Sequence, residues 1–136
     1  MLKLLVVEDD PNIRNLLTRR LNREGFQIIT ASNGVQAVAL ARAERPALIL
    51  LDIDIPILDG RKTAQRLRAH PETQGIPIIV LTESQLEERD DQLAAYGCDA
   101  YEPKPINFPQ MIARVRWLAR PDGGERLRAP TPMSMC

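Results

Sequence analysis

Five short apolar runs alternate along this chain with longer, more polar segments. The apolar runs are residues 3–7, 26–31, 47–51, 76–81 and 98–102. Three of them are continuously apolar, which is typical of strands that are buried on both faces of a parallel sheet. The segments between and after them are helix candidates at residues 11–24, 33–45, 61–69, 84–96 and 109–120. Strict alternation of strand and helix predicts right-handed crossovers with helices on both sheet faces, so we expect a doubly wound α/β fold with a five-stranded parallel sheet.

The first helix candidate has clear boundaries in the sequence. Asp10 is a favourable N-cap residue, Pro11 suits the first helical position, and Gly25 is a typical residue just after a helix. The apolar side chains at helical spacing form one stripe, made of Ile13, Leu16, Leu17 and Leu21. We therefore predict that this helix packs on the sheet through that stripe.

The length and composition indicate one domain with a hydrophobic core. The chain has 136 residues, of which 44% are hydrophobic, and two domains of half this length would each be small. After residue 120 the sequence contains Pro and Gly without an apolar period. We predict a domain over residues 1–119 and a disordered tail over residues 120–136. The alternative for this tail is a truncated linker to an output domain.

The balance of charge argues against bulk electrostatic partners. The chain has 18 basic and 18 acidic residues, so its formal net charge is zero. This balance gives no general attraction to nucleic acid or to an anionic membrane surface, and we expect neither as a partner. The apolar run near the N-terminus is short and is followed by acids, which does not fit a signal peptide or a membrane span. A cytoplasmic location is the expectation.

Polar residues follow the predicted strands at the points where the strands end. Because the carboxyl ends of parallel strands meet at one edge of a sheet, and ligands bind there, these residues are expected to converge. They are Glu8 and Asp9 after the first strand, Asp52 and Asp54 after the third, Thr82 after the fourth, and Lys104 after the fifth.

A cluster of carboxylates needs protons or a cation. Two unit charges about 4 Å apart repel each other by roughly 4 kcal/mol at an effective dielectric constant near 20. Hard oxygen ligands at a partly open site suit Mg²⁺, which binds through one or two carboxylates together with a phosphate. A carboxylate beside Mg²⁺ and a lysine can attack phosphorus and form an aspartyl phosphate. In that chemistry Lys104 neutralises the phosphoryl oxygens and Thr82 donates a hydrogen bond to one of them. The plainer alternative is that strand-end carboxylates cap the following helices, as we expect of Asp10 and Asp59.

The combined motifs resemble the receiver domain of two-component response regulators. The resemblance rests on VVEDD, LLDIDIPILDG, IIVLTES and GCDAYEPKP, and it covers roughly residues 1–119 in order. It implies a flavodoxin-like fold with the strand order 2-1-3-4-5. It also implies that the peptide bond between Lys104 and Pro105 is cis, which is uncommon for X-Pro bonds.

The resemblance implies a role for each residue of the cluster. Mg²⁺ is the implied cofactor, with Mn²⁺ as a substitute. The residues that match the motifs of the family are Asp52 as phosphoacceptor, Glu8 and Asp9 as the metal-binding acids (Asp9 directly, Glu8 through water), Asp54 through its backbone carbonyl, Thr82 as the switch hydroxyl, Tyr101 as the switch aromatic residue, and Lys104 as the contact to the phosphoryl group.

Two positions depart from the common pattern of the family. Glu83 stands where a small residue is usual, and Asp54 adds a negative charge close to the cluster. Neither removes a required group, but both leave the lifetime of the phosphoryl group open.

The resemblance also implies partners. A sensor histidine kinase or a histidine phosphotransfer protein would supply the phosphoryl group. In such domains the first helix, which here carries Arg14, Arg19, Arg20 and Arg23, packs against the helices with the phosphodonor histidine. A downstream protein would bind the surface formed by residues 84–96, 98–102 and 109–120. The helix over residues 84–96 has few apolar anchors and many acids, which is typical of a movable element.

The resulting prediction is a single-domain response regulator, a phosphorylation-controlled switch and not an enzyme. One alternative is a receiver-like interaction domain that works without phosphorylation. Another is a phosphatase of the haloacid dehalogenase type, which also uses Asp-x-Asp and Mg²⁺. In that class the Asp-x-Asp lies on the first strand and the other acids come late, whereas here Glu8 and Asp9 precede Asp52.

Overall fold

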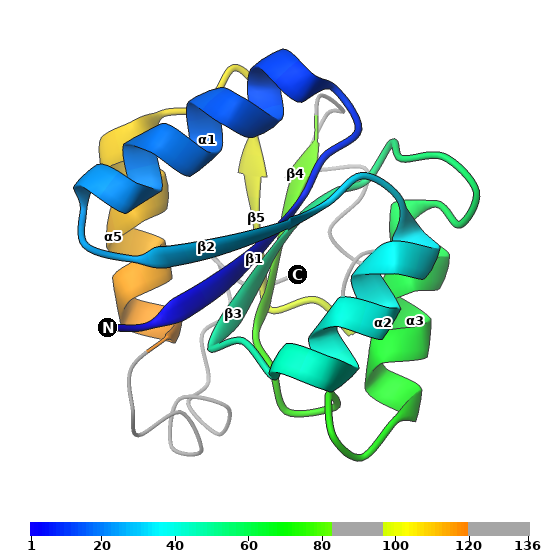
Figure 1. Ribbon diagram of the computed structural model, residues 1–136. Helices are drawn as coiled ribbons and strands as arrows, with labels where there is room; N and C mark the ends of the chain where they lie inside the picture. Colours follow the sequence, from blue (N-terminus) through cyan, green and yellow to red (C-terminus); the bar gives the residue numbers. More distant parts are fainter. Residues whose placement is uncertain (83–96, 120–136) are drawn as a thin grey trace.

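The computed structural model describes residues 1–82 and 97–119 of the chain. Within these ranges it contains five strands and four helices, which alternate along residues 3–82 (Figure 1). The elements are β1 (Lys3–Val7), α1 (Pro11–Arg23), β2 (Gln27–Ala31), α2 (Gly34–Glu44), β3 (Leu48–Asp52), α3 (Gly60–Ala69), β4 (Ile78–Thr82), β5 (Ala100–Pro103) and α5 (Phe108–Leu118). The predicted helix over residues 84–96 and the predicted tail over residues 120–136 lie outside the described residues.

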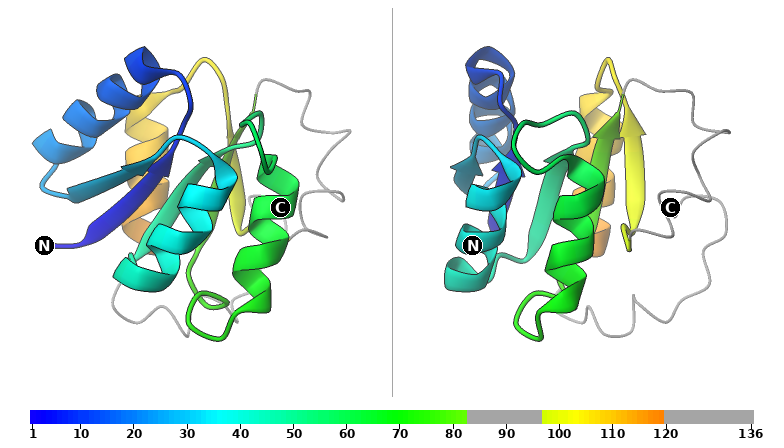
Figure 2. Two further views of the ribbon diagram at one scale, coloured as in Figure 1. Left: turned by 45° about the vertical axis from the view of Figure 1, so that its right-hand side comes forward. Right: turned by 90° about the vertical axis from the view of Figure 1, so that its right-hand side faces the viewer.

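All neighbouring strands pair in parallel, in the order β2-β1-β3-β4-β5. Helices α1 and α5 cover one face of this sheet, and α2 and α3 cover the other (Figures 1 and 2). The fold class and the strand order that the sequence predicted are therefore confirmed. None of the helices in the described part of the chain is long and apolar enough to span a membrane.

The three central strands are apolar on both faces because each face has its own core. Fully burying one leucine or isoleucine side chain contributes about 1.5–3 kcal/mol. Alternate residues of β1, β3 and β4 point to opposite sides. The core on the side of α2 and α3 contains Leu5, Val7, Ile49, Leu51, Ile78, Val80, Ala37, Ala41, Ala64 and Leu67. The core on the side of α1 and α5 contains Leu4, Val6, Leu48, Leu50, Ile79, Leu81, Leu17, Leu21, Met111 and Val115.

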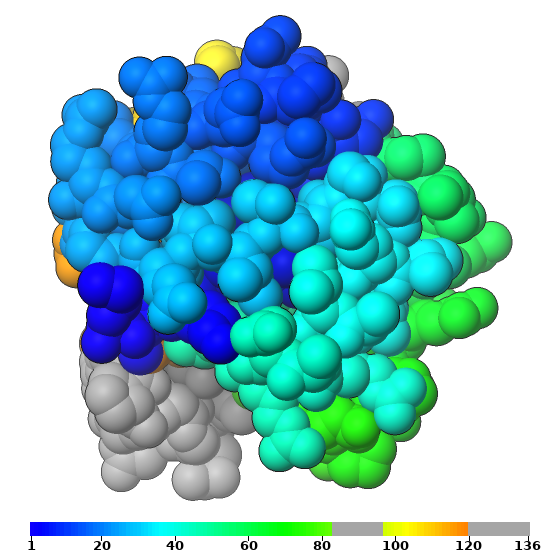
Figure 3. Space-filling view, viewed as in Figure 1, coloured from blue at the N-terminus to red at the C-terminus, as the bar shows by residue number. Residues whose placement is uncertain are grey.

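Helix α1 begins as the sequence predicted. The Asp10 side chain caps it by accepting a hydrogen bond from the backbone N–H of Asn12 at 2.9 Å. The predicted core stripe is only partly right, because Leu17 and Leu21 are buried whereas Leu16 is 53% exposed. Leu16 and Leu17 are adjacent on the helix, so both cannot face the sheet. In the space-filling view the atoms of α1 extend across the upper part of the molecular face (Figure 3).

A tight contact holds the loop between β3 and α3. Asp59 caps α3, as expected, by accepting a hydrogen bond from the backbone N–H of Lys62 at 2.9 Å. The backbone N–H of Gly60 donates to the carbonyl oxygen of Ile53 at 2.9 Å. A Cβ at position 60 would lie 2.5 Å from the Ile53 Cα atom, so the close approach requires glycine. This contact fixes the start of α3 against the residue that follows Asp52.

Candidate functional site

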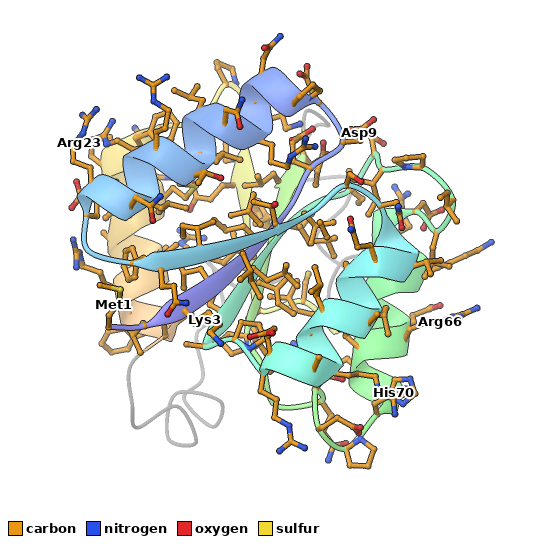
Figure 4. The ribbon with its side chains drawn as sticks, viewed as in Figure 1. Met1, Lys3, Asp9, Arg23, Arg66 and His70 are labelled. Carbon is orange, nitrogen blue, oxygen red and sulfur yellow. The ribbon has the colours of Figure 1, made fainter. Side chains whose placement is uncertain are left out.

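The polar residues that follow the strands converge at one edge of the sheet. Asp52 and Thr82 are the last residues of β3 and β4, and Glu8 directly follows β1, where its backbone N–H donates to the Ala31 carbonyl at 3.0 Å. Glu8, Asp52 and Thr82 are buried, whereas Asp9 is exposed at the end of β1 (Figure 4). The sequence-based expectation of convergence is therefore met for these positions.

Three of the carboxylates are close enough to share a cation. Glu8, Asp9 and Asp52 each offer one oxygen, and these oxygens lie within 4.8 Å of one another. The Oε1 atom of Glu8 is buried and has no hydrogen-bond partner among the described residues. A buried carboxylate oxygen in that state, beside two further carboxylates, is the kind of hard donor that Mg²⁺ prefers. The residues present therefore fit a divalent cation.

Asp52 is held at both of its carboxylate oxygens. The backbone N–H of Asp54 donates to Oδ1 at 3.0 Å, and Nζ of Lys104 lies 3.1 Å from Oδ2. The same Nζ lies 3.8 Å from Oε1 of Glu8. Lys104 is itself positioned by its backbone N–H, which donates to the Thr82 carbonyl at 2.9 Å, and the peptide bond to Pro105 is cis, as predicted. Lys104 thus supplies the counter-charge that two buried carboxylates need.

Burial changes the ionisation of Glu8. It raises the pKa of this carboxyl from 4.5 to about 7, mainly because the charged form loses solvation. The hydrogen bond from the backbone N–H of Asp10 acts in the opposite direction, while the charge of Asp52 adds to the rise. In the metal-free protein Glu8 therefore carries a proton for part of the time near pH 7. A proton and a cation are two ways to relieve the same repulsion.

This pKa predicts how stability depends on pH. In the folded protein the pKa of the Glu8 carboxyl is about 7, above its usual value of 4.5, so the protonated form of Glu8 favours folding. Its contribution is complete below pH 4.5 and is lost as the pH rises through about 7. Glu8→Gln stays neutral, so in EDTA at about pH 8 we expect its free energy of unfolding to exceed that of the wild type by on the order of 1–3 kcal/mol.

Urea denaturation of both proteins at several pH values measures this difference. The advantage of Glu8→Gln should shrink towards about pH 5, where the wild-type carboxyl is itself protonated. Saturating Mg²⁺ should favour the wild type instead, because an ionised carboxylate binds the cation better than an amide. If the free energies of unfolding of the two proteins in EDTA changed with pH in parallel, the raised pKa of Glu8 would be contradicted.

The remaining predicted residues occupy different surroundings. The side chain of Asp54 is exposed, and its contact with Asp52 is made by the backbone. Thr82 is fully buried. Tyr101 lies on β5 in register with Val80 and is partly buried against the core beneath α2 and α3. Glu83 lies outside the described residues.

Two charged residues, one at this edge and one beside it, make contacts that the sequence did not predict. Arg14 of α1 donates from Nη1 to the backbone carbonyl of Glu8 at 2.9 Å, which ties α1 to the loop after β1. Glu102 is fully buried on β5, where it lies 3.1 Å from Nε of Arg114 and accepts a hydrogen bond from Gln110 at 3.1 Å. Burial raises the pKa of Glu102, and Arg114 acts against that rise. Both contacts depend on side chains that meet only in the folded chain.

An apolar groove opens beside the acidic cluster. Its volume is about 630 Å³. Helix α1 forms one wall and the loop between β5 and α5 forms the other. The lining residues are Ile13, Leu16, Leu17, Lys104, Pro105, Ile106 and Phe108. The exposure of Leu16 is explained by this groove, which it lines instead of the core.

The fold defines a class of protein. A five-stranded parallel sheet in the order 2-1-3-4-5, with helices on both faces, is the arrangement of a CheY-like receiver fold. The chain belongs to the response regulator receiver domain family, whose family model matches residues 4–116. Receiver domains are signalling domains of two-component systems.

Curated relatives of the chain are transcriptional regulators. The DNA-binding dual master transcriptional regulator RpaA of Synechocystis is 37% identical over 122 residues, which cover 88% of this chain and 50% of that protein. The transcriptional regulatory protein SrrA of Staphylococcus aureus is 40% identical over 118 residues, which cover 87% of this chain and 48% of that protein. The chain thus spans about half the length of these relatives.

Solved structures with the same fold are receiver domains and response regulators. The receiver domain of the sensor histidine kinase PA1611 from Pseudomonas aeruginosa is 27% identical with a TM-score of 0.80, covering 87% of this chain and 97% of that one. That structure has a magnesium ion coordinated in its active site cleft. The chemotaxis protein CheY4 of Vibrio cholerae is 26% identical with a TM-score of 0.81, covering 86% of this chain and 98% of that one.

Proposed function

We propose that this receiver accepts a phosphoryl group on Asp52 in a Mg²⁺-dependent reaction and thereby switches its binding to a partner protein. The donor is the phosphohistidine of a sensor histidine kinase or of a histidine phosphotransfer protein. The observation that carries the proposal is the buried Asp52 carboxylate, which lies 3.1 Å from Lys104 and within 4.8 Å of the carboxylate oxygens of Glu8 and Asp9. The proposed location is the cytoplasm.

The chemistry is an in-line displacement at phosphorus. A carboxylate oxygen of Asp52 forms the new bond to phosphorus while the P–N bond of the donor breaks, and the donor imidazole leaves as a neutral ring after taking up a proton. The backbone hydrogen bond from Asp54 to Oδ1 orients the Asp52 carboxylate before the attack. The contact of Lys104 with Oδ2 supports a role in neutralising the phosphoryl oxygens.

A bound divalent cation would complete the charge balance. Asp9 and Asp52 would hold it with their carboxylates and Glu8 through a water molecule, together with the backbone carbonyl of Asp54. Mg²⁺, or Mn²⁺ in its place, supplies positive charge that offsets the charge on the transferring phosphoryl group. The buried Oε1 of Glu8, which has no hydrogen-bond partner among the described residues, and the all-oxygen donor set support this assignment.

Phosphorylation at Asp52 would change the conformation of residues next to the site. Thr82 is proposed to donate its hydroxyl hydrogen bond to the phosphoryl group, and Tyr101 to turn inward in response. This would shift a population of conformations that already exists. The surface that a downstream protein would bind comprises β5, α5 and residues 84–96, the last of which lie outside the described residues. We propose no nucleic-acid or membrane contact for this receiver, and no turnover beyond its own phosphorylation and slow dephosphorylation.

The groove beside Lys104 is the proposed docking site for the donor. Its walls present apolar side chains of α1 and of the loop before α5, and Leu16 is half exposed there. Exposed apolar surface next to a charged reaction site is typical of a protein-binding site. A donor seated there would bring its phosphohistidine close to Lys104 and Asp52.

Intact-protein mass spectrometry with a small-molecule phosphodonor tests the proposed function. Phosphoramidate with Mg²⁺ is expected to add one phosphoryl group per chain, and EDTA in place of Mg²⁺ to prevent the addition. A receiver-like domain that works without phosphorylation would gain no mass under either condition. A phosphatase of the haloacid dehalogenase type would instead turn over p-nitrophenyl phosphate repeatedly, and we expect no such turnover.

A further inference from the structure

The turn between β1 and α1 carries two of the three clustered carboxylates. It consists of Glu8, Asp9 and Asp10, which follow β1 and precede α1. Asp52, the third member of the cluster, is the last residue of β3 and is paired within the sheet. Asp9 lies outside the strands and helices, so contacts other than strand pairing must set the distance between its carboxylate and Asp52.

Two of the three carboxylates are held through their own oxygens. Both oxygens of Asp52 accept hydrogen bonds, and Oε2 of Glu8 accepts one from the backbone N–H of Asp10 at 3.1 Å. The Asp9 side chain is exposed and has no hydrogen bond or ion pair with any residue in the ranges 1–82 and 97–119. One of its oxygens nevertheless lies within 4.8 Å of oxygens of the other two acids. The position of the Asp9 carboxylate therefore depends on the backbone that carries it.

The peptide unit between Glu8 and Asp9 is held by Arg14. Its carbonyl oxygen accepts a hydrogen bond from Nη1 of Arg14 at 2.9 Å, in partly buried surroundings. On the other side of Glu8, the backbone N–H donates to the Ala31 carbonyl at 3.0 Å. Both backbone groups of Glu8 are thus engaged, one with the neighbouring strand and one with a side chain of α1.

Peptide planarity extends the effect of this contact to Asp9. The carbonyl group of Glu8 and the nitrogen and Cα atoms of Asp9 lie in one plane, because the C–N bond between the two residues has partial double-bond character. A hydrogen bond that sets the direction of the Glu8 carbonyl therefore also sets the Asp9 Cα atom, from which the carboxylate extends. If the carbonyl were not held, this peptide unit could rotate and move the Asp9 carboxylate away from the other two acids.

Arg14 reaches this carbonyl because of its place on α1. It lies in the first turn of the helix, where its own backbone N–H donates to the Asp10 carbonyl at 2.9 Å. Side chains on a helix tilt towards its N-terminus, so the long Arg14 side chain extends back over the turn. Arg14 therefore contacts both Asp10 and Glu8, the first with its backbone and the second with its guanidinium group. The family resemblance groups Arg14 with arginines that face a donor, whereas in the structure its Nη1 atom is directed at the turn.

We propose that Arg14 is a positioning residue for the divalent cation, because it fixes the peptide between Glu8 and Asp9 and thereby presents the Asp9 carboxylate to the ion. This inference rests on the proposed function, which supplies the cation. In this role Arg14 touches neither the cation nor the phosphoryl group, and it takes no part in the reaction at Asp52. Removing a contact that orients a metal ligand typically weakens metal binding by about 10–100-fold.

The direction of the effect separates positioning from charge. Arg14→Met keeps the length of the side chain but removes its charge and its donors. If Arg14 acted only through its charge, the loss of a cationic group near the site would strengthen Mg²⁺ binding. We expect the opposite, a Mg²⁺ affinity about tenfold weaker than that of the wild type, measured by isothermal titration calorimetry without a phosphodonor. Arg14→Lys, which keeps the charge and can donate to the same carbonyl, should recover most of the affinity.

Labelling with phosphoramidate at increasing Mg²⁺ concentration gives a second readout. In Arg14→Met the Mg²⁺ concentration for half-maximal labelling should rise about tenfold, whereas the labelling rate at saturating Mg²⁺ should stay close to that of the wild type. A purely structural role would lower the free energy of unfolding in urea and leave the half-maximal Mg²⁺ concentration of the folded protein unchanged. The matched control is Arg66→Met, an exposed arginine of α3 with no ion pair in the described ranges (Figure 4), which should leave both Mg²⁺ readouts unchanged.

Arg14→Ala covers the case in which Arg14→Met does not fold. The smaller side chain admits water to the Glu8 carbonyl, which satisfies its hydrogen bond without fixing its direction, so the Mg²⁺ affinity should again fall. Unchanged or tighter Mg²⁺ binding in the folded variant, or an equal loss in Arg66→Met, would overturn the inference.

The two levels of the proposal fail in different ways. If the wild type binds Mg²⁺ and is labelled by phosphoramidate, but Arg14→Met binds Mg²⁺ equally well, the inference is wrong and the proposed function stands. If the wild type binds no Mg²⁺ and gains no phosphoryl group, the proposed function is wrong, and the inference falls with it.

Discussion

Asp52→Asn is expected to abolish the Mg²⁺-dependent addition of a phosphoryl group. The substitution keeps the shape of the side chain, so the hydrogen bond from the Asp54 backbone to Oδ1 can persist. It removes the negative charge that makes the side chain a nucleophile and a cation ligand. Intact mass after incubation with phosphoramidate and Mg²⁺ should therefore show the adduct in the wild type and none in the variant.

The matched control is the same change two residues further along the chain. The Asp54 side chain is exposed, and Asp54 contacts Asp52 only through its backbone N–H. Asp54→Asn should therefore still accept the phosphoryl group, with a change in rate or lifetime at most, since it removes one negative charge near the site. An adduct of undiminished amount on Asp52→Asn would show that another residue is the acceptor. Loss of the adduct in both variants would indicate that the reduced negative charge near the site, and not the loss of one nucleophile, prevents labelling.

Gly60→Ala is expected to destabilise the fold by about 3 kcal/mol, which is at the upper end of the range for overpacking a tight site. A Cβ atom at this position would lie 2.5 Å from the Ile53 Cα atom, 2.9 Å from the Ile53 carbonyl oxygen and 3.1 Å from the Asp52 carbonyl oxygen. All three are backbone atoms at the end of β3, so no side-chain rotation can relieve the clash. Urea denaturation followed by circular dichroism measures the loss.

Gly75→Ala provides the comparison for this prediction. Nothing lies within 4 Å of a Cβ built at position 75. The same added methyl group should therefore change the free energy of unfolding by less than about 1 kcal/mol, with slight stabilisation expected because alanine restricts the unfolded chain. Equal destabilisation by both substitutions would contradict the packing argument. Because Gly60 touches the residues that follow the acceptor strand, its substitution should also slow labelling with phosphoramidate.

The fold could be predicted largely because its strongest determinant is visible in the sequence. Residues 4–7 and 47–51 are continuously apolar, and the structure uses both faces of β1 and β3 to cover separate cores. Helix caps at Asp10 and Asp59 depend on contacts two or three residues away, so local sequence was sufficient for them as well. The strand order was expected from the family resemblance, and the pairing confirms it.

The wrong and missing predictions depend on contacts between distant segments. Leu16 fits a helical apolar stripe as well as Leu17 does, and only the loop before α5 reveals that Leu16 lines a groove. Glu102 stands in a short strand whose solvent exposure depends on where α5 packs. The raised pKa of Glu8 follows from burial by neighbours that the sequence alone does not place. The single-domain assignment and the domain boundary at residue 119 stay predictions.

Convergence of the acids at one edge could be predicted because topology alone brings strand ends together. The roles of Asp52, Thr82 and Tyr101 rest instead on the resemblance, and they are proposals here. For Asp52 the structure adds its contact with Nζ of Lys104 at 3.1 Å. Lys104 contacts both Asp52 and Glu8, so the positive charge of one ammonium group is shared by two carboxylates in the absence of a metal ion.

The buried Glu102 limits how this receiver can be recombined with others. Its carboxylate lies on β5, and its two partners, Arg114 and Gln110, both lie on α5. A chimaera that takes α5 from a receiver with apolar residues at these positions would leave a buried carboxylate without its guanidinium, and the reverse exchange would leave a guanidinium without its carboxylate. Either mismatch is far more costly than replacing the whole pair. For protein engineering, β5 and α5 therefore form one interchangeable cassette, and crossover points belong before Ala100 rather than in the loop that leads to Phe108.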